Sequence, residues 1–158
     1  IGIKTQMPNL FNGLPVSENV WLAAKRTHTS AHAQKIAKDV IERVGIGRIG
    51  ASQVGTLSHG QRQLVELATV LAGEPRLVLL DEPAAGMTTE ETARLAEIVR
   101  EISTTAAVIV VEHDMQFIRE IARTVTVFHQ GKVIVEDGVD AVMKNPLVRD
   151  VYLGKQAA

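Results

Sequence analysis

Residues 77–82, Leu-Val-Leu-Leu-Asp-Glu, decide the fold of this chain. A short, nearly unbroken aliphatic run that ends in two acids is typical of a strand buried on both faces within a parallel sheet. Residues 108–111 repeat the pattern and end in Glu112-His113. Between the two runs, Thr88 and Glu91 form a capping box for a helix. The sequence therefore predicts a strand–helix–strand crossover and an α/β fold.

Three helices are expected before the first of these strands. Ser17 offers a cap for a helix over residues 18–25, and Ser30–Val44 form a second helix with Gly45 as its C-terminal cap. A third helix begins at Ser58 and runs to Gly73. The apolar residues of each of the first two helices recur on one face, which predicts that these helices pack on each other.

The end of the sequence predicts a hairpin and two short helices. Residues 124–128 and 132–135 read as strands joined by Gln130-Gly131, and the helices follow at 139–143 and 147–152.

Composition narrows the function classes. The chain has 158 residues, 46% of them hydrophobic, which suits one globular domain, and its net charge of −1 argues against a nucleic-acid partner. It has no cysteine, which fits a reducing, cytoplasmic setting. Its apolar runs are much shorter than the ~20 residues that span a bilayer, so any membrane-spanning part is expected to belong to partner proteins. The first residue is Ile1 rather than Met, and no positively charged region leads into an apolar stretch and cleavage site as in a signal peptide, so we expect a segment cut from a longer chain.

Three groups of polar residues carry the candidate chemistry. Ser58 and Gly60 at a helix start can hold phosphate oxygens, although an ordinary serine cap explains Ser58 equally well. Asp81 at a strand tip can hold Mg²⁺ and Glu82 can orient or deprotonate water, unless the two are a solvated acidic pair. His113 can bond a terminal phosphate, or it is a surface histidine.

In combination, Leu57-Ser58-His59-Gly60-Gln61, the 77–82 strand and His113 resemble the signature motif, Walker B strand and switch histidine of ATP-binding-cassette (ABC) ATPases. The resemblance covers essentially the whole chain. It implies a P-loop NTPase-like ABC ATPase fragment, with an α-helical signature subdomain and the C-terminal half of the parallel-sheet catalytic core. The expected parts are a glutamine-loop segment at 1–16, the helical subdomain at 17–73 and the half-core at 74–158.

The resemblance also implies the site, with ATP and Mg²⁺ as its ligands. Glu82 and His113 are the expected catalytic residues, and Asp81 together with Gln6 of the glutamine loop is expected at the Mg²⁺ ion. Gln6 is expected to touch the coupling helix of a membrane subunit as well. The residues expected to contact nucleotide are Gln6, Ser58, His59, Gly60, Gln61 and Asp81.

A phosphate loop needs Gly, four residues, Gly-Lys and then Ser or Thr, and no segment here complies. Gly131-Lys132 precedes Val133, and Gly154-Lys155 precedes Gln156. We therefore expect that loop upstream of Ile1, weak or absent ATP binding by this chain alone and no hydrolysis by it. An apolar sheet edge or face left exposed would favour self-association.

Departures from the commoner family pattern bear on the solute and on communication across the dimer. His59 replaces the usual glycine and, with Ala85-Gly86-Met87 and the ending at 151–154, resembles importers of branched-chain amino acids and urea. His59 favours urea. Thr88 stands where many members carry aspartate, so communication across the dimer is expected to differ.

The resemblance implies several partners and a location. The expected partners are a second ABC ATPase subunit, transmembrane permease subunits and, indirectly, a solute-binding protein. The chain is then cytoplasmic and peripheral on the inner face of the cell membrane.

Two other classes stay open. One is the C-terminal lobe of a split chromosome-maintenance ATPase, against which the missing heptads and the near-neutral charge argue. The other is a non-catalytic interaction module.

Two further patterns are given little weight. Residues 45–50 match a dinucleotide-binding pattern but follow a helix rather than a strand. His28 and His32 are spaced for a metal, but no carboxylate or third ligand stands near them in the sequence, which favours a solvated helix end.

Overall fold

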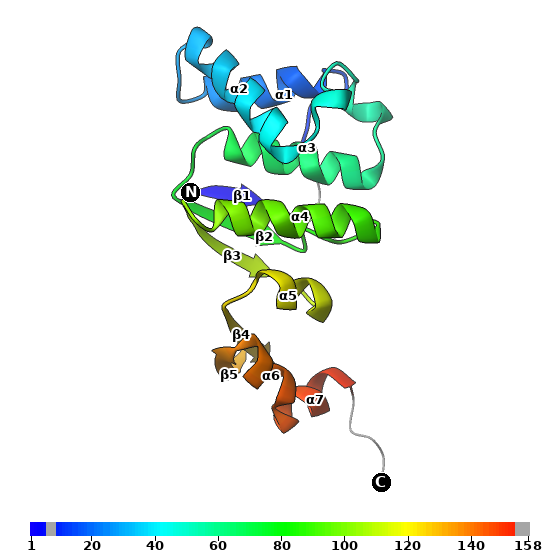
Figure 1. Cartoon of the computed structure of the whole chain (residues 1–158), viewed down its shortest axis with the longest axis vertical. Coiled ribbons are helices and arrows are strands. Elements are labelled where there is room, and N and C mark those ends of the chain that lie inside the picture. The colour runs from blue at the N-terminus through cyan, green and yellow to red at the C-terminus, as the bar shows by residue number, and fades with distance from the viewer. Residues whose placement is uncertain (6–8, 154–158) are drawn as a thin grey trace. The chain divides into compact units, whose positions relative to one another are not determined.

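The computed structural model describes residues 1–5 and 9–153 (Figure 1). It divides into two compact units, Ile1–His113 and the remainder from Asp114, and each is described by itself. The elements in chain order are β1 (Gly2–Lys4), α1 (Val16–Lys25), α2 (Ser30–Val44), the 3₁₀ turns Gly47–Ile49 and Val54–Thr56, α3 (His59–Leu71), β2 (Leu77–Asp81), α4 (Thr89–Ile102), β3 (Ala107–Val111), α5 (Met115–Ile121), β4 (Thr124–His129), β5 (Lys132–Gly138), α6 (Val139–Lys144) and α7 (Pro146–Leu153).

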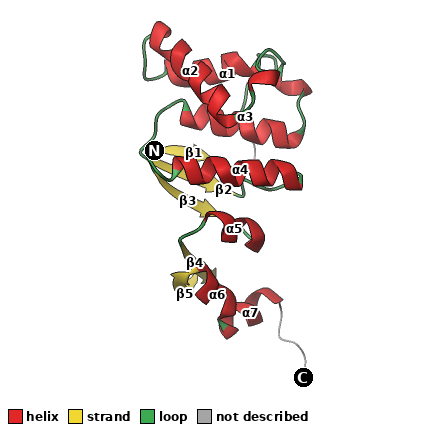
Figure 2. Ribbon diagram, in the orientation of Figure 1, coloured by secondary structure: helices red, strands yellow, loops and turns green. Residues whose placement is uncertain are grey.

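The first unit contains a three-stranded parallel sheet in the order β1-β2-β3. The two strands expected from the aliphatic runs are confirmed, and α4 connects them as the crossover helix (Figure 2). The strand β1 was not expected. It is only three residues long and gains its pairing from β2, where Ile3 lies opposite Leu79.

The expectation of strands buried on both faces is wrong. Residues of β2 alternate between buried and partly buried, and in β3 the side chains of Ile109 and Val111 are 56% and 61% exposed. Helices α3 and α4 contact the sheet, and the alternate row of side chains that includes Ile3 and Ile109 is left open. This is the exposed apolar sheet face that the sequence suggested, and self-association through it stays a prediction.

Helices α1 and α2 pack on each other as expected, and α3 packs against both, because each of the three presents an apolar face to the others. Gly45 ends α2 in the left-handed region, with φ of 79°, as a C-terminal cap requires. The expected Ser17 cap is wrong, since α1 begins at Val16 with Pro15 before it and no side-chain cap. The Ser17 amide instead donates to the Gly50 carbonyl at 2.9 Å, which ties the helix start to the connector.

The second unit is built on the expected β4–β5 hairpin. Its turn residues Gln130 and Gly131 both have positive φ, 49° and 75°, which suits a tight turn between twisted strands. The expected α6 and α7 are present and enclose a small core of Val127, Val142 and Val148. The helix α5 was not expected, and the Asp114 carboxylate caps it by accepting from the Gln116 amide at 2.9 Å.

Candidate functional site

The carboxyl ends of β2 and β3 bring three of the expected site residues together. Asp81 closes β2 and pairs in register with Val111 of β3. The next residue, Glu82, has φ of 41°, and its amide donates to the Val111 carbonyl at 2.9 Å. Its Oε1 atom lies 3.5 Å from Nδ1 of His113. Two carboxylates and an imidazole therefore meet at one edge of the sheet, where α/β folds hold their ligands.

The buried side chain of Glu112 connects the backbone segments at this edge of the sheet. Its side chain is only 2% exposed, and its carboxylate accepts from the backbone amides of Ala84 and His113, each at 3.0 Å. It thereby ties the loop after β2 to the end of β3. The sequence contained a signal for it, because Glu112 follows its strand as Asp81 and Glu82 follow theirs.

The start of α3 carries the expected serine site. The Ser58 hydroxyl oxygen accepts from the Gln61 amide at 3.2 Å, and Gln61 Oε1 accepts from the Ser58 amide at 3.1 Å, which is a complete capping box. Ser58 is exposed, and because its hydroxyl oxygen only accepts within the capping box, the hydroxyl can still donate to a ligand. A hydroxyl donor at the positive end of a 13-residue helix suits an anion.

The next two signature residues face other parts of the same chain, the loop after β2 for His59 and the first turn of α4 for Gly60. His59 Nε2 lies 3.1 Å from the carbonyl oxygen of Ala85, to which it can only donate, and 3.1 Å from the side-chain amide nitrogen of Gln63, from which it can only accept. Gly60 is buried against the carboxylate of Glu91, the second member of the α4 capping box. Nucleotide contact by His59 and Gly60 stays a prediction. Gln6 lies outside the described residues.

A buried ion pair, which the sequence did not indicate, links β1 to α3. Lys4 is 0% exposed, and its Nζ atom lies 3.6 Å from Oε2 of Glu66. The other carboxylate oxygen of Glu66 accepts from the Asn9 amide at 3.2 Å. Burial lowers the pKa of Lys4 and raises the pKa of Glu66, and in each case the attraction of the partner charge opposes the shift.

The donor set at the strand tips fits Mg²⁺ and a phosphorylated ligand. Asp81 is exposed and offers the hard carboxylate oxygen that Mg²⁺ prefers. Glu82 and His113 stand beside it with groups that accept or donate protons.

The family model described as "ABC transporter" matches residues 1–85, more than half of the chain. The chain belongs to the ABC transporter family. The fold agrees, because cbiO1 of Clostridium perfringens, described as part of the ABC transporter complex cbiONQ, superposes with a TM-score of 0.82 at 26% identity. That match covers 96% of this chain and 62% of cbiO1.

Curated members of the ABC transporter family with similar sequences differ in what their names say they transport. The branched-chain amino acid transport ATP-binding protein BraF of Pseudomonas aeruginosa is 30% identical over 78% of this chain and 49% of BraF. The lipopolysaccharide export protein LptB of Acidithiobacillus ferridurans is 27% identical over 99% of this chain and 66% of LptB. The chain thus spans about half to two thirds of the length of these relatives.

Among the residues that the structure describes, no helix has both the length and the apolar character needed to cross a bilayer.

Proposed function

We propose that this chain is part of the ATP-binding and ATP-hydrolysing subunit of an ABC importer for urea or branched-chain amino acids. The observation that carries the proposal is the meeting of Glu82 and His113, 3.5 Å apart, beside Asp81 at the tips of two adjacent parallel strands. Family membership and the similarity to BraF support it.

In the proposed site, each group at the strand tips has one role. Asp81, with Gln6, holds Mg²⁺, which would neutralise charge on the phosphates. Glu82, whose carboxylate lies 3.5 Å from the imidazole of His113, would orient or deprotonate the attacking water. His113 donates a hydrogen bond to the terminal phosphate. The carboxylate of Glu112 fixes the backbone on which His113 and the loop after β2 depend.

The signature residues are proposed to serve a second subunit. Ser58 and Gly60 would contact the terminal phosphate of ATP held by that subunit's phosphate loop, with the α3 dipole favouring the negative charge. His59, which contacts Ala85, would link this contact to the loop that follows Glu82. In this arrangement each ATP site is composite, built from the phosphate loop of one subunit and the signature residues of the other. A movement of the signature residues would then be passed to the loop after Glu82, and so to the second site.

We propose the partners accordingly. They are a second ABC ATPase subunit, transmembrane permease subunits and, through these, a solute-binding protein. The description of cbiO1 as part of a transporter complex supports this arrangement. The chain would act in the cytoplasm, on the inner face of the membrane.

The test mixes this chain with full-length BraF and measures association by sedimentation with and without Mg·ATP. We expect association that requires Mg·ATP and is abolished by Ser58→Arg, because ATP held by the phosphate loop of BraF would bridge to Ser58. The control Ser103→Arg, at an exposed serine after α4, should behave as the wild type. Association that is absent, or that survives Ser58→Arg, would overturn the proposal.

A calorimetric titration of this chain alone with Mg·ATP complements that test. No phosphate loop occurs in these 158 residues, so we expect no detectable heat. Micromolar binding would show that another segment replaces the phosphate loop, and that the assignment of this chain as only one part of each ATP site is wrong.

A further inference from the structure

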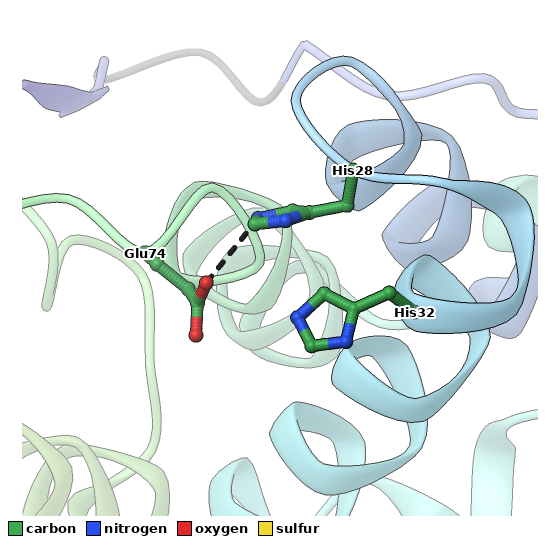
Figure 3. A group of neighbouring side chains, drawn as sticks. All are labelled: His28, His32 and Glu74. Atoms are coloured by element: carbon green, nitrogen blue, oxygen red, sulfur yellow. Dashed lines mark ion pairs between the residues drawn. The ribbon is translucent and has the colours of Figure 1, made fainter.

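A cluster of metal-ligating side chains lies in the helical part of the first unit, apart from the residues assigned above (Figure 3). It consists of His28, His32 and Glu74, and one ligand atom from each lies within 4.8 Å of the other two. The closest pair is Nε2 of His28 and Oε2 of Glu74, 3.2 Å apart. The fold therefore supplies the carboxylate that the sequence lacked beside the two histidines.

Three helix ends hold these ligands in place. His28 lies in the turn between α1 and α2, where its amide donates to the Ala24 carbonyl at 3.2 Å, and His32 lies in the first turn of α2. Glu74 follows α3, and its amide donates to the Leu71 carbonyl at 2.9 Å. Because the three helices pack on one another, the ligands come from one connected body.

The backbone at Glu74 is unusual. Its φ of 48° places it in the left-handed region, which residues other than glycine seldom adopt. This conformation directs the chain out of α3, and Figure 3 shows the carboxylate turned toward the ring of His28. Residues in such conformations are often found at ligand-binding sites.

The imidazole of His28 has a buried nitrogen without a hydrogen-bond partner among the described residues. Its Nε2 atom is buried and makes no hydrogen bond with any described residue, although the Glu74 carboxylate faces it. The ring of His32 lies beside it, with centroids 5.0 Å apart and a tilt of 59°. Buried polar atoms are normally satisfied, and a metal ion would satisfy this nitrogen as well as the exposed His32 and Glu74.

We propose that His28, His32 and Glu74 bind a divalent transition-metal cation of the Zn²⁺ class. Two imidazoles and one carboxylate are a ligand set that zinc accepts, with water in the fourth position. Ligand atoms of a tetrahedral zinc site lie about 3.3 Å apart. The pair of His28 and Glu74 already has this spacing at 3.2 Å, so the inward movement falls to His32. His32 is exposed, which leaves its side chain room to rotate.

A bound ion would join the α1–α2 turn to the end of α3. Binding to the folded state alone raises stability, so the helical part should gain resistance to unfolding when the metal is present. The competing explanation is a metal-free ion pair between protonated His28 and Glu74. The two differ in their need for His32, which contributes a ligand only to the metal site.

The experiment titrates Zn²⁺ alone into the chelator-treated, untagged 158-residue chain by calorimetry. We expect one ion per chain, and a loss of affinity of at least ~100-fold in His32→Ala and in Glu74→Gln, since even outer partners of metal ligands change affinity ~10–100-fold. The matched control is His129→Ala, which removes an exposed histidine from β4 in the other unit and should leave the affinity unchanged.

A second readout keeps the proposal testable if a variant folds poorly. Co²⁺ added to the wild-type chain should give the visible absorption of a four-coordinate ion with nitrogen and oxygen ligands, and Zn²⁺ should displace it. Circular dichroism checks that each variant keeps its helices. Absence of binding, an affinity unchanged by His32→Ala, or an equal loss in His129→Ala would each overturn the proposal.

Discussion

His59 Nε2 lies 3.1 Å from the carbonyl oxygen of Ala85, and this contact joins the first turn of α3 to the loop that follows β2. The neighbouring Gly86 makes the approach possible. Its φ is 70°, and a Cβ atom there would lie 2.9 Å from Cδ2 of the imidazole. The side chain at position 59 and the glycine at position 86 therefore depend on each other.

Gly86→Ala should cost more stability than another left-handed glycine of the same unit. We expect Gly45→Ala, with φ of 79° and only the flexible end of Arg94 nearby, to cost about 1–2 kcal/mol. Gly86→Ala should exceed this by about 1 kcal/mol because the ring of His59 must move as well. Urea unfolding followed by the fluorescence of Trp21 measures both.

Removing the imidazole tests the cause of that excess. In the His59→Gly background, Gly86→Ala and Gly45→Ala should cost nearly the same. Equal costs in the wild-type background, or an excess that persists without the ring, would contradict the proposed dependence.

The buried pair of Lys4 and Glu66 should be strongly coupled. Lys4→Met or Glu66→Met alone leaves an unpaired buried charge and should cost about 3–5 kcal/mol, whereas the double variant should cost far less than the sum. The control is the exposed pair of Lys35 and Asp39, 3.3 Å apart, whose coupling should be only about 0.3–0.5 kcal/mol. A double-mutant cycle in urea gives both values, and similar coupling in the two pairs would contradict the expected effect of burial.

The raised pKa of Glu66 predicts a pH dependence. Burial lifts the pKa of this carboxyl above its ordinary value of 4.5, so the folded chain keeps a proton that the unfolded chain has already lost. Its stabilising contribution is complete below pH 4.5 and is lost as the pH rises through the folded-state pKa. The wild type should therefore gain stability relative to Glu66→Gln as the pH falls from neutral toward 4.5.

Parallel urea titrations of the wild type and Glu66→Gln across this range supply the measurement. Taking the difference between the two proteins cancels the titration of every group that does not interact with Glu66, whereas its ion-pair partner Lys4 is left in. A difference that is flat, or that grows as the pH rises, would show that burial does not control this carboxyl.

Local patterns predicted the parts of the fold that local physics decides. The aliphatic runs gave β2 and β3, and Gln130-Gly131 gave the hairpin turn. The meeting of Glu82 with His113 was also predictable, because adjacent parallel strands end at one edge of a sheet.

Features that depend on distant residues were not predictable. The strand β1 has three residues and looks polar at Lys4, whose burial makes sense only beside Glu66. The carboxylate of Glu74 reaches His28 only because the three helices pack together. The spacing of these residues along the sequence indicates neither the contact of Lys4 with Glu66 nor that of His28 with Glu74.

Thr88 stands where many members of the ABC family carry aspartate, and in the structure it caps α4. Its hydroxyl oxygen accepts from the Glu91 amide at 3.2 Å, and the Glu91 carboxylate accepts from the Thr88 amide at 2.9 Å. Aspartate caps helices at least as well, so Thr88→Asp should change stability by less than about 0.5 kcal/mol, whereas Thr88→Ala should cost about 1 kcal/mol. Urea unfolding of the two variants compares them directly. A cost for Thr88→Asp as large as that for Thr88→Ala would mean that an added charge beside Glu91 outweighs the retained cap.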